Sequence, residues 1–131
     1  MSVSRITKGR IGELIAAAAI EACGWVTVLT PMEYIDILAI KDGMFMRVQV
    51  KASMLGGKTP VYRFMTSTNK RENLSSDHID VLAIVALDLR KVIFTNVSDL
   101  KKGLRVSPHH FDGVDVEKTS WKNAVNSVLG I

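Results

Sequence analysis

The pattern that decides the fold lies in residues 34–52, whose sequence is YIDILAIKDGMFMRVQVKA. Residues 34–41 and residues 44–52 are rich in β-branched, aromatic and long apolar side chains, and each segment predicts a β-strand. The Asp42-Gly43 dipeptide between them is a strong signal for a two-residue hairpin turn. The stretch therefore predicts an antiparallel hairpin around which the other elements are arranged.

The turn also predicts the register of this hairpin. A two-residue loop pairs Lys41 with Met44, so the numbers of paired residues sum to 85. Asp36 then lies opposite Gln49, and Lys51 shares the face of Gln49 because side chains alternate between the two faces of a strand. A slip of one residue would move every side chain to the other face. The opposite face is expected to be apolar and to belong to a core: Ile35, Ile37, Val48 and Val50.

An acid, an amide and an ammonium group on one patch suit metal-assisted hydrolysis of a phosphodiester. Mg²⁺ prefers oxygen ligands, and Asp36 together with the backbone carbonyl of Val50 can supply them. A bound metal activates water, and Lys51 can orient that water or neutralise developing charge. Glu13 adds a second carboxylate if its helix packs over this patch. The alternative is that Asp36, Gln49 and Lys51 only form the hydrated face of an antiparallel sheet.

A helix is predicted before the hairpin, at residues 7–23, with Thr7 as its N-cap and Gly24 as its stop. The side of this helix opposite its main stripe is nearly as apolar, so the helix is expected to be buried on several sides. The main stripe at helical spacing consists of Ile11, Leu14, Ile15, Ala18, Ala19 and Ala22.

Further strands and a closing helix complete the predicted elements. The strands are expected at residues 25–30, 60–65, 81–87 and 92–95. The closing helix is expected at residues 120–129, with Trp121, Val125, Val128 and Leu129 on one side. A helical turn is expected at residues 98–101, and loops at residues 67–77 and 107–118. This order predicts a single domain, residues 1–131, of mixed α/β or α+β class.

Composition and charge leave the class of function open. The chain of 131 residues is 47% apolar and 23% charged, as is ordinary for a globular domain. Its formal net charge of +4 permits a polyanionic partner without requiring one. The single cysteine, Cys23, is expected to be a buried structural thiol in a reducing, cytoplasmic setting. The apolar run at residues 14–20 is too short to span a bilayer, so no membrane partner is expected.

Taken in order, three short motifs resemble those of the PD-(D/E)xK nuclease superfamily. They are Lys8-Gly9-x-x-Gly12-Glu13, Tyr34-x-Asp36 and Arg47-Val48-Gln49-Val50-Lys51. The pattern is most similar to the Gln-x-Lys branch, to which a group I intron homing endonuclease belongs. Archaeal-type Holliday junction resolvases share the same core pattern with Glu-x-Lys. The resemblance covers residues 7–53 and extends through the two strands expected at residues 81–87 and 92–95.

The resemblance implies a restriction-endonuclease-like core of αβββαβ type, with a mixed sheet of about five to six strands flanked by helices. It also implies a DNA endonuclease that hydrolyses phosphodiester bonds with Mg²⁺, for which Mn²⁺ can substitute. The expected partner is double-stranded or branched DNA. Because cleavage of both strands of a duplex needs two active sites or two binding events, a homodimer or a higher homo-oligomer is expected.

Carried over position by position, the resemblance assigns a role to each site residue. Asp36 would be the central metal ligand, Glu13 the helix acid that completes the site, and Lys51 the catalytic lysine. Gln49 stands where most of the superfamily has an acid, and Ile35 stands where many members have proline. Gln49 is the norm in the Gln-x-Lys branch, but elsewhere it marks a dead enzyme. The alternative function is therefore a non-catalytic DNA-binding or assembly protein on the same fold.

Basic side chains give the expected DNA contacts. Residues 58–71 contain four basic residues before any acid, which leaves 13 basic and 13 acidic residues in the rest of the chain. This stretch can follow a DNA backbone or form an exposed loop. Arg47 can touch a phosphate or pair with an acid, and the first turn of the helix can hold phosphate or be merely solvated. The candidates are Lys8, Arg10, Arg47, Lys58, Arg63, Lys70 and Arg71.

Overall fold

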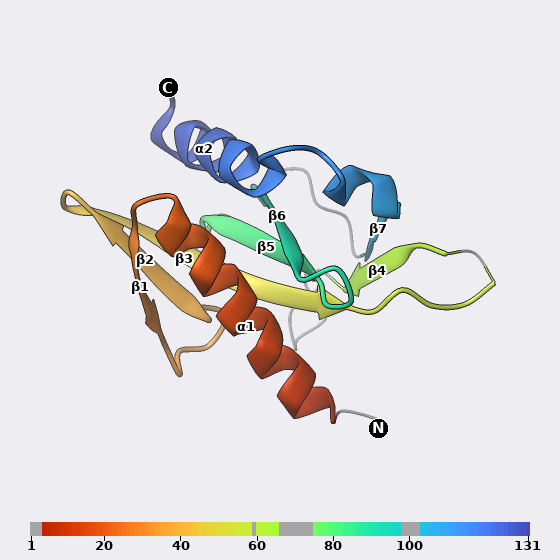
Figure 1. The fold of residues 1–131 in the computed structure, drawn as a ribbon. Coiled ribbons are helices and arrows are strands. Elements are labelled where there is room, and N and C mark those ends of the chain that lie inside the picture. The colour runs from red at the N-terminus through yellow and green to blue at the C-terminus, as the bar shows by residue number, and fades with distance from the viewer. Residues whose placement is uncertain (1–3, 59, 66–74, 98–102) are drawn as a thin grey trace.

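The computed structural model of the chain describes residues 4–58, 60–65, 75–97 and 103–131 (Figure 1). Its first elements are α1 (Arg5–Ala22), β1 (Val26–Leu29), β2 (Ile37–Lys41), β3 (Met44–Ser53) and β4 (Tyr62–Met65). They are followed by β5 (Val81–Ala86), β6 (Lys91–Thr95), β7 (Gly103–Val106), the 3₁₀-helix η1 (Pro108–Phe111) and α2 (Val116–Leu129). Neither helix is long and apolar enough to cross a membrane, as far as the described residues go.

Five strands form one mixed sheet in the order β1-β2-β3-β5-β6, and β4 and β7 form a separate antiparallel pair. The β3–β5 pair is parallel and the other pairs of the large sheet are antiparallel. The predicted fold class, a mixed sheet flanked by helices, is therefore confirmed. In the described part of the connection from β3 to β5 the chain forms β4, whereas an αβββαβ core carries a helix there.

The predicted hairpin and its register are confirmed as far as Ile37 and Val48, but the predicted pairing of Asp36 with Gln49 is not part of the ladder. Ile37 pairs with Val48 and Lys41 pairs with Met44, so paired numbers sum to 85 as expected. Asp42 and Gly43 have φ values of 49° and 78°. Two consecutive positive φ values are what a two-residue turn of type I′ needs, and Asp-Gly tolerates them at low cost.

The start of α1 and its buried face differ from the prediction. Ser4, not Thr7, is the N-cap, and its Oγ accepts a hydrogen bond from the Thr7 N–H at 3.2 Å. The buried positions are Gly12, Ala16 and Ile20. In the predicted stripe, Leu14, Ala18 and Ala22 are exposed, and Ile11, Ile15 and Ala19 are half-buried.

Close packing explains which face of α1 is buried. A Cβ built on Gly12 would lie 2.8 Å from the Cβ of Ala52 and 3.6 Å from Cγ1 of Val50, both on β3. The small side chain of Ala16 continues this contact one turn later. Because α1 is apolar almost all round, periodicity cannot distinguish its faces. The face with the smallest side chains allows the closest approach to the sheet and becomes the buried one.

Two hydrophobic clusters lie on the two faces of the large sheet. Both helices cover one face, where Ile20 and Trp121 pack against strand residues such as Val48. The β4–β7 pair and η1 cover part of the other face, where Tyr62 packs near Ile84. Figure 1 shows α1 in front of the sheet and the β4–β7 pair beyond its right-hand end.

One predicted face assignment is wrong. Ile35 was expected to share a core with Ile37, but the two residues belong to clusters on opposite faces. The regular pairing of β2 ends at Ile37, and the N–H of Asp36 donates to the carbonyl of Val48 at 2.9 Å. The chain therefore leaves the regular ladder at Asp36, and alternation does not continue across this residue.

The C-terminal third also departs from the prediction. Strand β7 was not expected, and η1 and the start of α2 at Val116 fall in the predicted loop at residues 107–118. Trp121 and Val125 are buried as expected, whereas Val128 and Leu129 are 39% and 42% exposed. The turn expected at residues 98–101 and most of the loop at residues 67–77 lie outside the described residues.

Candidate active site

The two elements that carry the predicted site residues meet where β2 and β3 part. Asp36 directly precedes β2, while Gln49 and Lys51 lie further along β3, beyond the last β2 pair. The close approach of α1 to β3 at Gly12 places the next residue, Glu13, beside the same edge. The fold therefore brings Glu13 and Lys51 within electrostatic reach of Asp36, and Gln49 lies on the face of β3 that carries Lys51.

Asp36 is anchored by the backbone of β3. Its Oδ2 accepts a hydrogen bond from the N–H of Val50 at 2.8 Å. Burial raises the pKa of Asp36, although the Val50 N–H and the positive charge of Lys51 partly lower it. The carboxylate thus has a fixed orientation in a setting that disfavours its negative charge, and a cation nearby would favour it.

Glu13 lies within electrostatic reach of Asp36. Its pKa is raised, first by burial and then by the negative charge of Asp36, while Arg10 acts in the opposite direction. A cation bound between these two half-buried carboxyl groups would relieve their repulsion and favour their ionised forms.

Lys51 completes the charged part of the site. Burial lowers the pKa of Lys51, and the negative charge of Asp36 opposes this effect. The one ion pair in the described ranges joins Arg47 and Asp80. Lys51 therefore lies within electrostatic reach of Asp36 without forming a salt bridge to it, so its ammonium group is available to bind a ligand.

Gln49 carries an unusual polar atom. Its Oε1 is buried and has no hydrogen-bond partner among the residues that the structure describes. A buried acceptor without a partner costs about 1–3 kcal/mol, and a cation or a bound water would satisfy it. The Gln49 side chain therefore offers a buried oxygen atom that accepts no hydrogen bond from the described residues and could ligate a cation.

The residues present fit a hard cation. The N–H of Val50 points toward Asp36, and in an extended strand the carbonyl of the same residue faces the same neighbour. Carboxylate, amide and backbone oxygens are the ligands that Mg²⁺ takes, usually with several waters. The described residues contain no cluster of three or more His, Cys, Asp or Glu side chains that could hold a metal ion by themselves. Because the candidate ligand atoms here are all oxygens, they suit Mg²⁺ or Mn²⁺ better than zinc.

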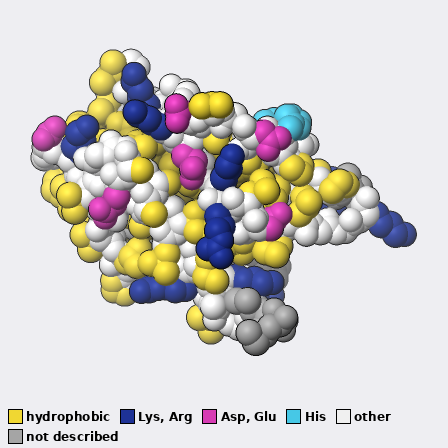
Figure 2. Space-filling view, viewed as in Figure 1, with side chains coloured by type: hydrophobic (Ala, Val, Ile, Leu, Met, Phe, Trp, Pro, Cys, Tyr) yellow, Lys and Arg dark blue, Asp and Glu magenta, His cyan; other side chains and the backbone are white. Residues whose placement is uncertain are grey.

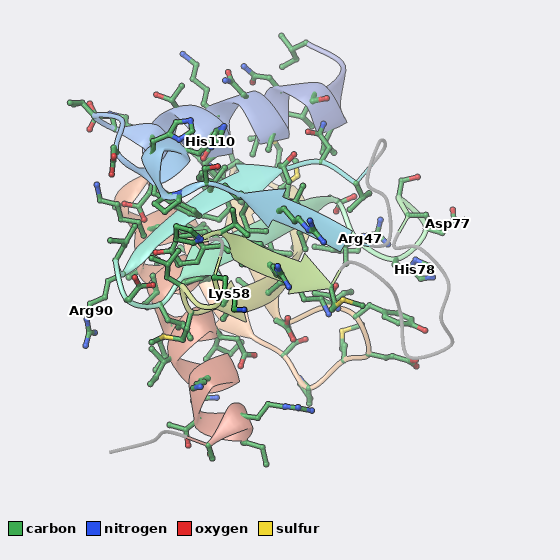
Figure 3. All side chains as sticks on the ribbon, turned by 90° about the vertical axis from the view of Figure 1, so that its right-hand side faces the viewer. Arg47, Lys58, Asp77, His78, Arg90 and His110 are labelled. Carbon is green, nitrogen blue, oxygen red and sulfur yellow. The ribbon has the colours of Figure 1, made fainter. Side chains whose placement is uncertain are left out.

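Arg47 is already engaged inside the protein. Its Nη2 lies 3.0 Å from Asp80 Oδ1 and its Nε lies 3.2 Å from Oδ2. The guanidinium also donates to the carbonyls of Asp77 and Ser76 at 3.2 and 2.7 Å. Figure 3 shows Arg47 on the same side of the molecule as Asp77. Of the two roles left open for Arg47, pairing with an acid is present, and a phosphate contact stays a prediction.

The other basic candidates fall into three groups. Lys8 and Arg10 are exposed near the start of α1. Lys58 is exposed within the β3–β4 connection, and Arg63 is exposed on β4. In Figure 3 Lys58 lies near the centre of the face turned to the viewer. Lys70 and Arg71 lie outside the described residues.

One basic residue was missed by the sequence reasoning. Arg105 on β7 lies directly opposite Arg63 on β4, and both side chains are exposed. The alternation of Leu104, Arg105 and Val106 could have indicated a strand. Its pairing with a strand about 40 residues away follows no local rule. The two arginines form a cross-strand pair of like charge, which we call the arginine pair.

No protein-family model matches the sequence, and no curated protein matches it. A solved structure described as that of a bacterial homing endonuclease, I-Ssp6803I, matches the fold with a TM-score of 0.75. The match covers 98% of this chain and 96% of that chain, at 16% sequence identity. The chain therefore has the fold of that homing endonuclease over nearly its whole length.

Proposed function

We propose that the chain is a metal-dependent DNA endonuclease of the homing-endonuclease type, built on a PD-(D/E)xK-like site. The observation that carries this proposal is the meeting of Glu13, Asp36 and Lys51 where β2 and β3 part, with the unpartnered Gln49 Oε1 on the same strand as Lys51. The likeness of the fold to a homing endonuclease supports it.

Each site residue has a task in phosphodiester hydrolysis. Asp36 and Glu13 would hold Mg²⁺, with the Val50 carbonyl and Gln49 Oε1 as further oxygen ligands. The metal supplies Lewis-acid stabilisation of the phosphate and a more acidic bound water. Lys51, whose pKa is lowered by burial, releases a proton more readily than an exposed lysine. It can therefore position the attacking water and exchange a proton with it.

The arginine pair supports DNA as the substrate. Like charges directly opposite each other destabilise a strand pair, and neither Arg63 nor Arg105 has an acidic partner in the part of the chain that the structure describes. A phosphate between the two guanidinium groups would remove the repulsion and form charge-assisted hydrogen bonds. Lys58 precedes the same strand pair. We propose that this surface contacts the backbone of double-stranded or branched DNA.

Cleavage of both strands requires two such sites or two binding events. A single domain carries one copy of Asp36 and Lys51, so we propose that the active form is a homodimer or a higher homo-oligomer. The second candidate function is a non-catalytic DNA-binding or assembly protein, which Gln49 in the usual acid position favours.

The experiment that separates the two functions uses supercoiled plasmid with Mg²⁺ or Mn²⁺. We expect metal-dependent nicking by the unaltered protein and its loss in Asp36→Asn and Lys51→Met. Asp42→Asn makes the same chemical change at the other end of the hairpin and should keep the activity. DNA retardation without cleavage of plasmid, linear duplex or a synthetic four-way junction would establish the binding protein instead.

A further inference from the structure

A cavity lies away from the candidate active site. It is found where the C-terminal end of α1, the β2–β3 turn and α2 come together, elements that Figure 1 shows. Its volume is about 420 Å³. Apolar side chains line much of it, among them Trp25, Met44, Trp121 and Val125. The rings of Trp25 and Trp121 meet edge to face, with centroids 5.4 Å apart. We call this feature the lysine-rimmed cavity, for the charges described next.

Three lysines from two elements line this cavity. Lys41 ends β2, while Lys118 and Lys122 are one turn apart on α2. The Nζ of Lys41 lies 3.8 Å from the position of a Cβ built on Gly24, which brings it over the end of α1. Figure 2 shows basic side chains beside hydrophobic ones at this corner of the molecule.

The charge around this cavity is mostly positive, although Glu117 lies within electrostatic reach of Cys23 in its wall. Among the described residues that line it, none is acidic, and no lysine here forms an ion pair. Glu117 is the acid next to Lys118 on α2, and its Oε2 accepts a hydrogen bond from the N–H of Val92 at 3.2 Å. A negatively charged occupant would therefore meet three unpaired ammonium groups.

We propose that the lysine-rimmed cavity binds small amphipathic organic anions, with the apolar body on the two tryptophans and a carboxylate on the lysines. A volume of about 420 Å³ is in the range of small-molecule sites. An apolar wall with a few charged groups of one sign is the arrangement that orients such a ligand. The proposal does not depend on nuclease activity, because none of the candidate catalytic residues lines this cavity.

The chain provides two reporters of this cavity. Its two tryptophans both line it, so intrinsic fluorescence reports occupancy. Its single cysteine, Cys23, is half-buried and also lines it, so an occupant should slow thiol modification.

The test compares decanoate, decanol and decyltrimethylammonium, each below its aggregation concentration, with the full chain. We expect a saturable fluorescence change and slower labelling of Cys23 with decanoate, at lower concentration than with decanol. The cation should bind most weakly. Added salt should reduce the preference for the anion, since exposed charges are screened. Equal binding of all three, or of none, would overturn the proposal.

The double variant Lys118→Gln with Lys122→Gln removes two positive charges and tests whether these lysines bind the carboxylate. Decanoate binding should weaken by roughly three- to tenfold, as expected for the loss of two exposed charge pairs. Decanol binding should be unchanged, which also shows that the cavity is intact. Arg90→Gln removes a charge elsewhere on the surface and should change neither. Sedimentation that shows a second copy of the chain covering the cavity and excluding decanoate would also overturn the proposal.

Discussion

Replacement of Gly12 by alanine tests how closely α1 must approach the sheet. A Cβ at this position would lie 2.8 Å from the Cβ of Ala52, whereas ordinary contacts between such atoms are about 3.5–4.0 Å. The helix and β3 must therefore move apart by roughly 1 Å. Overpacking of this kind costs about 1–3 kcal/mol. The gain in helix propensity from replacing a glycine offsets about 1 kcal/mol of this cost.

We expect Gly12→Ala to lower the free energy of unfolding by up to about 2 kcal/mol in urea denaturation. Gly9→Ala on the same helix is the matched control, because a Cβ there has no atom within 4 Å. This control should raise the free energy of unfolding by about 0.5–1 kcal/mol.

The double variant Gly12→Ala with Ala52→Gly supplies the second half of the test. Removing the methyl group of Ala52 makes room for the new one, so the two changes should couple by at least about 1 kcal/mol. Plasmid nicking should fall in Gly12→Ala, because Glu13 moves with the helix, and should recover in the double variant. An increase in stability for Gly12→Ala equal to that of Gly9→Ala would refute the close-contact explanation.

Three further predictions concern single side chains. Tyr62→Phe removes hydrogen bonds of 2.9 Å to Asp88 and should cost about 1–2 kcal/mol. Because burial and Asp88 raise the pKa of Tyr62 to about 12, this contribution should be complete below the ordinary value of 10.0 and vanish as the pH rises toward 12 in alkaline denaturation. Asp36→Asn should abolish nicking yet leave the metal-free protein at least as stable at pH 7. The reason is that a carboxyl group whose folded-state pKa is raised opposes folding once it ionises. A large drop in melting temperature would contradict this. Arg105→Glu should stabilise the β4–β7 pair through Arg63 while weakening DNA binding and flattening its salt dependence, as measured by melting and by titration at several salt concentrations.

The part of the site that could be predicted depends on local chemistry. The Asp42-Gly43 turn has few conformations, so the register followed from it without knowledge of the rest of the fold. The register holds only as far as the pair of Ile37 and Val48, and Asp36 comes near Lys51 at the break that follows. Glu13 was expected only if α1 packed over the face that carries Gln49 and Lys51. Gly12 instead contacts Val50 and Ala52 on the opposite face of β3, and Glu13 comes within electrostatic reach of Asp36 from there.

The features that could not be predicted depend on distant parts of the chain. The pairing of Arg47 with Asp80 joins residues 33 positions apart, and the arginine pair requires β4 to meet β7. The buried face of α1 was predicted wrongly because apolar side chains occur on all sides of the helix, so periodicity does not distinguish its faces. The position of Ile35 depends on the break in the ladder at Asp36. The alternating sequence around Asp36 does not predict this break.

The central claim is that Asp36 and Glu13 hold a divalent cation beside Lys51. The most direct measurement is a crystal structure with Mn²⁺, using the anomalous signal of the metal. The account predicts one strong peak in contact with the Asp36 carboxylate and close to Glu13 and the Val50 carbonyl. A peak elsewhere, or an empty site at saturating Mn²⁺ with Lys51 turned to the far side of the sheet, would contradict it.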